Sequence, residues 1–168
     1  MSKADFIKKF NFPVGFQVPN AFAFEDIIAR PLSRNDVLAD MEGVNSSIEL
    51  IRKTRGGSWP AQPVTEAEDL LDLAWHEREF IDGSSYAYVV YNKDNQYIGC
   101  FYLYQMGYRT ELTDELESCD IDASWWVTAA AYEQGYYEKL YHALRKWLDD
   151  FPVDKIYYSN KEIPGEVK

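Results

Sequence analysis

The chain has 168 residues, the size of one domain, with 17 basic and 28 acidic side chains and a formal net charge of −11 at pH 7. Hydrophobic residues make up 46% and aromatic residues 16%, which excludes disordered and collagen-like proteins. No stretch approaches the roughly 20 apolar residues that a membrane span needs. The first ten residues also lack the apolar core of a signal peptide, so we expect neither a membrane nor a secreted protein.

The excess of acid lies in the middle of the chain. Residues 1–60 have a net charge of +1, residues 61–122 of −11 and residues 123–168 of −1. Because nucleic-acid binding depends on Lys and Arg that neutralise phosphates, we expect no nucleic-acid partner. Two explanations stay open for the acidic segment: it attracts a cationic ligand, or it only keeps the surface soluble.

The cysteines and the acidic residues give no sign of a metal site. Cys100 and Cys119 have no CxxC spacing, which argues against a disulfide scaffold and a thiolate zinc site and favours a reducing cytoplasm. The acids between Glu111 and Asp122 lack the DxDxDG order of a calcium-binding loop. We therefore expect a cytoplasmic protein without a bound metal.

The chain is predicted to begin with an extension, residues 1–20, before a single domain over residues 21–168. Apolar residues alternate through the extension, but Pro13 and Pro19 argue against a central strand. We expect an edge strand or a segment that lies across the domain.

Helices dominate the first half of the domain. A strand is predicted over residues 24–31, followed by helices that begin after Ser33, near residue 45 and at residue 65. Ser33 with Asp36 and Thr65 with Glu68 have the spacing of capping boxes, and Gly56-Gly57 is a typical helix end.

Strands and one long helix follow. Residues 85–92 and 96–104 are rich in Tyr, Val and Phe and flank a turn, which predicts a hairpin. Residues 120–128 are predicted as a strand, residues 135–149 as an amphipathic helix and residues 154–160 as a last strand. The element order predicts an α/β (α+β) fold, a mixed central sheet flanked by helices.

Three local motifs have ordinary explanations. HEREF, from His76, lacks the second His of a zinc-protease helix, so we expect His76 on a solvated acidic helix face. His142 is expected on the polar side of the long helix. Gly135 precedes that helix, whose free backbone N–H groups and dipole suit an anion, although an ordinary strand-to-helix turn would look the same.

Three passages taken in order carry a family resemblance, over about residues 22–160. They resemble the GNAT superfamily of acyl-coenzyme A-dependent N-acetyltransferases. The opening strand and the start of the first helix are similar to residues 27–36, and the second and third strands to residues 88–103. The fourth strand, the pyrophosphate loop and the third helix are similar to residues 124–148. The family's loop signature is Q/R-x-x-G-x-G/A. Gly135 matches its first Gly, while Tyr132 and Tyr137 stand in place of the Gln/Arg and of the second small residue.

The family usually continues past its fifth strand with a helix and two strands, and here only KEIPGEVK follows Asn160. These elements are therefore expected to be missing, or supplied by another chain or by the N-terminal extension. A missing sheet edge also makes a homodimer an expectation.

The resemblance implies acetyl-CoA as co-substrate, its arm lying between splayed fourth and fifth strands. By position, the arm would be bound by the backbone of Trp126 and Val127, the pyrophosphate would face Gln134, Gly135 and Tyr136, and Asn160 would face the pantetheine end.

The resemblance also implies direct attack of an amine on the thioester, with a base that takes the amine proton. Asp120 and Asp122 are candidates for this base, with Glu117 behind them, and Tyr157 or Tyr158 for the acid. The alternative for the two aspartates is that they are exposed acids at a strand end.

Two functions from different classes follow. The first is an N-acetyltransferase that acts on a cationic amine, such as a polyamine-like or aminoglycoside-like compound or a Lys-bearing peptide. The second is a catalytically inactive GNAT-fold module that binds a ligand or a protein partner. A chance similarity of an unrelated α+β domain is the remaining alternative.

Overall fold

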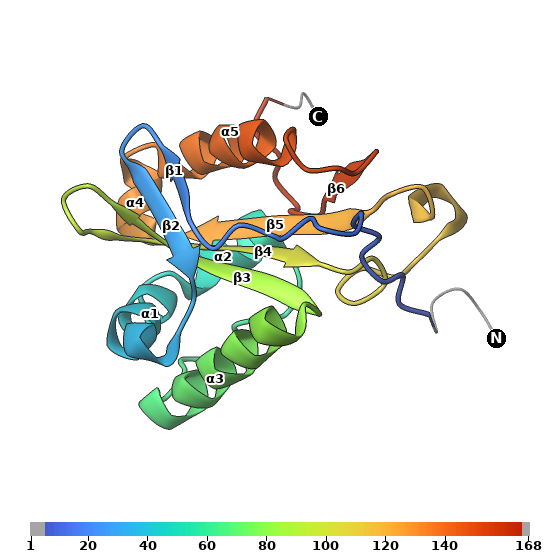
Figure 1. Ribbon diagram of the computed structural model, residues 1–168. Helices are drawn as coiled ribbons and strands as arrows, with labels where there is room; N and C mark the ends of the chain where they lie inside the picture. The colour runs from blue at the N-terminus through green and yellow to red at the C-terminus, as the bar shows by residue number, and fades with distance from the viewer. Residues whose placement is uncertain (1–5, 166–168) are drawn as a thin grey trace.

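Six strands form a single sheet in the computed structural model, which describes residues 6–165 (Figure 1). Their order across the sheet is their order in the chain: β1 Phe22–Phe24, β2 Ile27–Pro31, β3 Ser85–Asn92, β4 Tyr97–Tyr104, β5 Ile121–Val127 and β6 Ile156–Tyr158. Neighbours are antiparallel except for β5 and β6, which run parallel. The predicted hairpin therefore lies between the first strands and residues 121–127, which confirms the expected mixed sheet.

The helices divide between the two faces of this sheet (Figure 1). One face carries α1 Val37–Asn45, α2 Ile48–Arg55 and α3 Glu66–Asp82, and the other carries α4 Ala129–Glu133 and α5 Tyr136–Leu148. Both predicted capping boxes form, one at a short 3₁₀ turn that leads into α1 and one at the start of α3.

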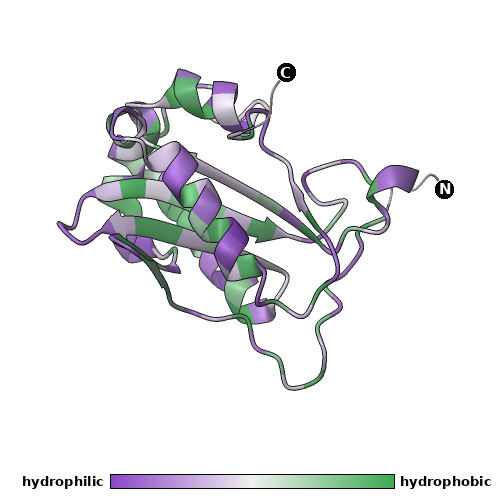
Figure 2. Cartoon of the chain, turned by 90° about the horizontal axis from the view of Figure 1, so that it is seen from above, coloured by the Kyte–Doolittle hydropathy of each residue, from purple (hydrophilic) through white to green (hydrophobic). Residues whose placement is uncertain are grey.

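Each face of the sheet has its own hydrophobic core, because side chains alternate along the strands. On β3, Tyr88 and Val90 face α5, whereas Ala87 and Val89 face α1 to α3. Strands buried on both faces read as continuous apolar runs, and Figure 2 shows the hydrophobic colour along them.

The stripe predicted on the long helix packs on the sheet. Leu140 and Leu144 of α5 are fully buried, and Trp147 stacks at an angle against Phe22, with ring centroids 5.1 Å apart. Truncation of such a buried leucine typically costs about 2–5 kcal/mol of stability.

Two predicted boundaries were wrong. The strand predicted over residues 24–31 is a pair, β1 and β2, joined at Glu25, which adopts a left-handed φ of 53°. The strand-to-helix path after β5 also contains α4, which the sequence analysis lacked. The hydroxyl of Thr128 accepts from the N–H of Ala131 and caps this short helix, whose Ala-rich sequence favours helix.

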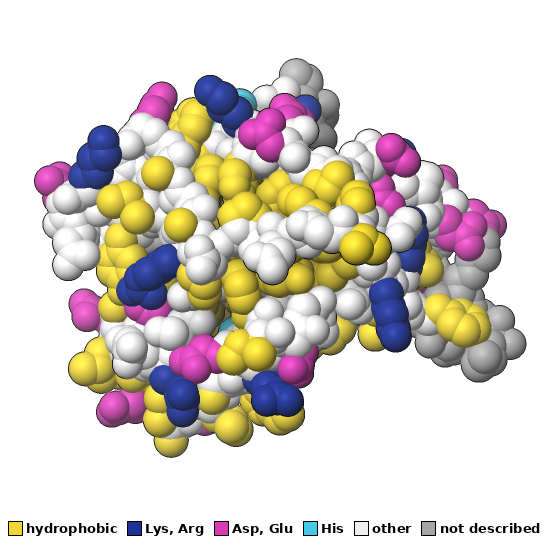
Figure 3. Space-filling view, viewed as in Figure 1, with side chains coloured by type: hydrophobic (Ala, Val, Ile, Leu, Met, Phe, Trp, Pro, Cys, Tyr) yellow, Lys and Arg dark blue, Asp and Glu magenta, His cyan; other side chains and the backbone are white. Residues whose placement is uncertain are grey.

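Residues 6–20 lie across the α5 face as an extended segment (Figure 1). Lys8 forms a single backbone bridge to Met106, and four apolar side chains pack against the α5-side core: Phe10, Phe12, Phe16 and Val18. In the space-filling view, hydrophobic side chains form a band across this face (Figure 3). The segment thus covers sheet surface that α5 leaves bare. Within residues 6–165 no helix has the length and apolar character to cross a bilayer.

Candidate functional site

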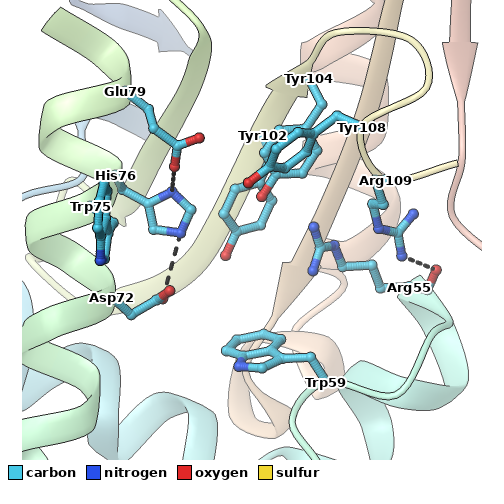
Figure 4. Close-up of a pocket in the computed structure, with 10 residues that line it drawn as sticks. All are labelled: Arg55, Trp59, Asp72, Trp75, His76, Glu79, Tyr102, Tyr104, Tyr108 and Arg109. Carbon is cyan, nitrogen blue, oxygen red and sulfur yellow. Dashed lines mark hydrogen bonds and ion pairs between the residues drawn. The ribbon is translucent and has the colours of Figure 1, made fainter. Parts of the chain in front are cut away.

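A pocket with a volume of about 570 Å³ opens between α3, β4 and the end of α2, on the face of the sheet opposite α5 (Figure 4). Its aromatic lining comprises Trp59, Trp75, Tyr102, Tyr104 and Tyr108. Its ionisable lining comprises Arg55, Asp72, His76, Glu79 and Arg109. We call this the acceptor-face pocket. It has the volume and aromatic lining of a small-molecule site.

The α3 wall of the acceptor-face pocket is acidic around one imidazole. His76 Nε2 lies 3.5 Å from Asp72 Oδ2, and Nδ1 lies 3.8 Å from Glu79 Oε1. Only 12% of the His76 side chain is exposed, so the expectation of a solvated helix face was wrong for this residue. The imidazole thus lines the pocket between two carboxylates.

The opposite wall carries two arginines (Figure 4). Arg55 ends α2 and is 7% exposed; its Nε and Nη2 both donate to Ser124 Oγ at 3.2 Å, and its guanidinium lies 4.3 Å from the Tyr102 ring centroid. Arg109 Nη1 donates to Ser159 Oγ at 2.7 Å, and Nη2 donates to the carbonyl of Arg55 at 3.1 Å. Burial, followed by the charge of Arg55, lowers the pKa of Arg109.

The predicted acid–base residues lie apart from one another. Asp120 accepts from Lys8 Nζ at 3.3 Å and from two backbone N–H groups in the loop before β6, so it fastens that loop. Tyr158 packs against Tyr141 of α5, on the face away from the acceptor-face pocket. Neither residue lines that pocket.

Asp122 lies behind the acceptor-face pocket. Its side chain is fully buried, and Oδ2 accepts from Thr110 Oγ1 at 2.8 Å. Burial raises its pKa, while Ser159, Thr110 and the charges of Arg109 and Arg55 act to lower it. The expectation of an exposed strand-end acid was therefore wrong for Asp122.

The predicted pyrophosphate residues meet at the start of α5. Gly135 precedes the helix with a left-handed φ of 87°, and a Cβ added there would meet no atom within 4 Å. A hollow of about 310 Å³ lies beside Gly135 and Tyr137. Gln134 is exposed, whereas the ring of Tyr136 is buried. The open Gly135 and the helix start suit an anion, although Glu138 and Glu162 also line the hollow.

The strands β5 and β6 part after three paired residues, at Ala123 and Tyr158. Beyond that point the side chain of Asn160 accepts from the N–H of Trp125 at 3.0 Å and donates to the Trp125 carbonyl at 2.9 Å. The chain then reaches α2, where the N–H of Lys161 donates to the Arg55 carbonyl. Asn160 therefore takes the place of a further strand residue in the gap.

The backbone of Trp126 and Val127 was predicted to bind the acetyl-CoA arm. Both residues lie at the end of β5, beyond the two hydrogen bonds between Asn160 and Trp125, which we call the Asn160 clamp. The Trp126 indole points to the α1–α3 face, where Nε1 donates to Tyr102 Oη at 2.8 Å, and Val127 packs on the α5 side. The structure thus brings Trp126, Val127 and Asn160 to the same sheet edge.

The sequence analysis missed the pocket residues His76, Arg55 and Arg109. A signal existed for His76: it shares the spacing of Asp69, Leu73 and Phe80, which is one face of a helix. Arg55 and Arg109 carried none, because their meeting depends on how a helix end and a distant loop come together.

No family model matches the chain, and the comparison with curated proteins gives no match. Solved structures do match. RimL, a ribosomal L7/L12 alpha-N-protein acetyltransferase in complex with coenzyme A, superposes with a TM-score of 0.59 at 12% identity, over 76% of this chain and 67% of that one. MccE, the microcin C7 self-immunity acetyltransferase with acetyl-CoA and AMP, gives 0.55 at 14% identity, over 77% and 66%.

An acetyltransferase of the GNAT family from Bacillus anthracis gives a TM-score of 0.51 at 14% identity, over 76% of this chain and 65% of that one. The chain thus spans about two thirds of the length of these proteins. Together with the strand order and the parting of β5 and β6, these similarities show that the chain has the GNAT fold.

Proposed function

We propose that this protein is an N-acetyltransferase that takes an acetyl group from acetyl-CoA and transfers it to a cationic amine. The observation that carries the proposal is the acceptor-face pocket, which opens against β4 beside β5 in a fold shared with CoA-binding acetyltransferases. A fold alone does not fix a function, so the argument rests on the pocket.

The start of α5 fits the diphosphate of acetyl-CoA. The open space at Gly135 and the free first turn of the helix would hold it, with the backbone of Gln134 and Tyr136 next to Gly135 in the chain. The gap between β5 and β6 does not fit the arm as the chain lies, because Asn160 fills it. The arm would reach the backbone of Trp126 and Val127 only after this side chain moves.

Acetyl-CoA would supply the acetyl thioester; the chain must bind the amine and accept its proton. Asp72 and Glu79 attract an ammonium group, and His76 between them is the group that we assign as proton acceptor. We assign this role to His76 rather than to Asp120, because the Asp120 side chain lies outside the pocket. Tyr158, the candidate acid, lies outside the pocket as well. Asp122 supports the neighbouring arginines from behind.

Binding of acetyl-CoA tests the proposal directly. A ligand that binds only the folded protein at 100 times its Kd stabilises it by about 2.7 kcal/mol, so we expect thermal unfolding to shift up by about 5–10 °C. Incubation with acetyl-CoA and a panel of primary amines, followed by mass spectrometry, should then show an acetylated amine.

The second candidate is a catalytically inactive module that binds a ligand in the acceptor-face pocket. The clamp of Asn160 on Trp125 favours it, because it closes the route of the arm. Asn160→Ala separates the two candidates, with Asn45→Ala as a matched control, since Asn45 holds the N–H and carbonyl of Val64 in the same way far from the gap. An acetyltransferase should gain affinity for acetyl-CoA in Asn160→Ala alone; no binding by either variant or by the wild type favours the inactive module.

We further propose a cytoplasmic location, which the free cysteines Cys100 and Cys119 support. Homodimerisation is also a proposal, and it would need more than a sheet edge, because the edge strands β1 and β6 are only three residues long and offer few backbone groups for pairing. Light scattering on the purified protein would decide the oligomeric state.

A further inference from the structure

We propose that the acceptor-face pocket binds a zwitterionic small molecule of the amino-acid type, with its carboxylate on the Arg55 side and its ammonium group on the Asp72 and Glu79 side. The proposal deepens the proposed function by naming a substrate class, but it does not require acetyl transfer. An inactive binding module with this pocket would take the same ligand.

The arginine wall carries positive charge without a paired carboxylate. Among the ion pairs of residues 6–165, none involves Arg55 or Arg109. Arg55 is only 7% exposed. Its nitrogens Nε and Nη2 both donate to the same acceptor, the hydroxyl of Ser124. A buried charge that lacks an opposite partner is costly, so an anion bound here would stabilise the fold.

Asp122 does not satisfy this demand. It lies close enough to influence both guanidinium groups, yet no oxygen of Asp122 comes within ion-pair distance of either. Its Oδ2 accepts from Thr110 and its Oδ1 has no hydrogen-bond partner. The cluster therefore contains two positive guanidinium groups and one buried carboxyl group. Its net charge on the side that faces the pocket is positive.

The facing wall has the opposite sign. Asp72 and Glu79 flank His76 on successive turns of α3, and their side chains are 49% and 20% exposed. Figure 4 shows these three side chains on one side of the pocket and the two arginines on the other, with Tyr102 and Tyr104 between them. A ligand with charge of only one sign would meet a like-charged wall, whereas a zwitterion is complementary to both.

The aromatic lining suits an apolar body between the two charged groups. Trp75 lies beside His76 on the α3 wall, Trp59 lies in the loop after α2 between the two walls, and Trp75 is 62% exposed. Exposed aromatic rings with a hydrophobic face are typical of ligand sites. An amino acid with an aromatic side chain combines all three features, so L-phenylalanine is the probe of choice.

Three probes that differ by one charged group test the proposal on the wild-type protein without acetyl-CoA. L-phenylalanine carries both groups, phenethylamine lacks the carboxylate and 3-phenylpropionate lacks the amine. Because hydrogen bonds to charged groups are the strong ones, we expect L-phenylalanine to bind at least about tenfold more tightly than either analogue in isothermal titration calorimetry. Equal affinity for all three, tightest binding of phenethylamine, or no binding of any at millimolar concentration would overturn the proposal.

Two variants assign the groups. Arg55→Met should make L-phenylalanine bind no better than phenethylamine, and Glu79→Gln combined with Asp72→Asn should make it bind no better than 3-phenylpropionate. Arg78→Gln is the matched control, because its side chain on α3 is 68% exposed and its guanidinium pairs with Asp82 outside the pocket. If Arg55→Met fails to fold, the acidic-wall variant decides: an unchanged preference for L-phenylalanine over 3-phenylpropionate would overturn the assignment. Acetyl-CoA binding is measured separately, so its failure leaves this result standing.

Discussion

Asn160 shows how much one side chain decides at the residue scale. Its amide mimics a strand residue: it pairs with both backbone groups of Trp125, and Nδ2 also lies 2.9 Å from Tyr137 Oη. Tyr137 stands where the GNAT loop signature has a small residue. Tyr137, which departs from the family pattern, therefore helps to hold Asn160 in place, and this contact links the loop sequence to the question of acetyl-CoA binding.

Gly135→Asp is expected to abolish acetyl-CoA binding while the circular dichroism spectrum is kept. The new carboxylate would stand in the open space at the start of α5 and repel a diphosphate. Gly135→Asn is the control, because Asn has the same shape, tolerates a left-handed φ and carries no charge. Equal acetyl-CoA affinity in folded Gly135→Asp and Gly135→Asn proteins would show that the loop is only a turn.

His76→Gln is expected to lower the turnover of the acceptor amine by about 10²–10⁴-fold, the usual contribution of a general base. Acetyl-CoA affinity should stay the same, because His76 lies on α3 and the proposed diphosphate site lies on α5. His142→Gln is the control: it sits on the exposed side of α5 beside Glu138. Turnover that is equal in the two variants would remove His76 from the mechanism.

At the scale of elements, α1 and α3 meet through two buried carboxyl groups. Asp40 is 3% exposed and Asp69 is 2% exposed, and the hydroxyl of Tyr97 also donates to Asp40. Burial, followed by a hydrogen bond with Asp40, raises the pKa of Asp69 to about 8, and burial raises the pKa of Asp40 as well. Cys100 and Asp72 are the other titratable groups beside the pair. We therefore expect the two carboxyl groups to share a proton where the helices meet.

This pair makes folding stability depend on pH. A raised pKa means that the folded state holds a proton more tightly than the unfolded chain, so the contribution is complete below about pH 4 and is lost as the pH rises through about 8. Asp69→Asn, which is neutral at every pH, is expected to stabilise the protein at pH 8 by about 3–4 kcal/mol relative to its effect at pH 5, which is roughly 6–15 °C in melting temperature. Asp82→Asn, at the exposed end of α3, should show no such difference. A parallel shift at both pH values would contradict the shared proton.

At the scale of the whole molecule, the N-terminal segment completes a layer. Phe12 and Phe16 contact Phe151 after α5, with ring centroids 6.3 and 5.4 Å apart, and Phe10 contacts Tyr86 of β3 at 5.5 Å. The sequence analysis left open whether an extension covers what the family's last elements cover. The structure places residues 6–20 on the sheet face of α5, where they pack against Tyr86 of β3 and against Phe151, which follows α5.

Phe12→Ala combined with Phe16→Ala is expected to destabilise the protein by about 2–4 kcal/mol, because two half-buried rings leave the α5-side core. For a domain of this size the melting temperature should fall by about 5–15 °C. Val14→Ala is the control in the same segment, since Val14 is fully exposed. If the double variant has the same melting temperature as Val14→Ala, the two phenylalanines of the segment contribute no stability.

The sequence by itself determined what depends on local spacing. Capping boxes at Ser33 and Thr65 set helix starts, the Tyr- and Val-rich runs set the β3–β4 hairpin, and the leucine stripe set the buried face of α5. Each of these signals lies within a few residues of the element that it defines. The GNAT-like order of the elements followed from them.

Only the tertiary structure decided the site. Arg55 meets Ser124 across 69 positions of the chain, and Asn160 meets Trp125 across 35. His76 faces a pocket rather than solvent because β4 and the end of α2 stand opposite α3. Charged side chains become buried and paired when surfaces from distant parts of the chain come together in folding. A local sequence pattern cannot predict which distant residues will line the wall of the pocket opposite α3.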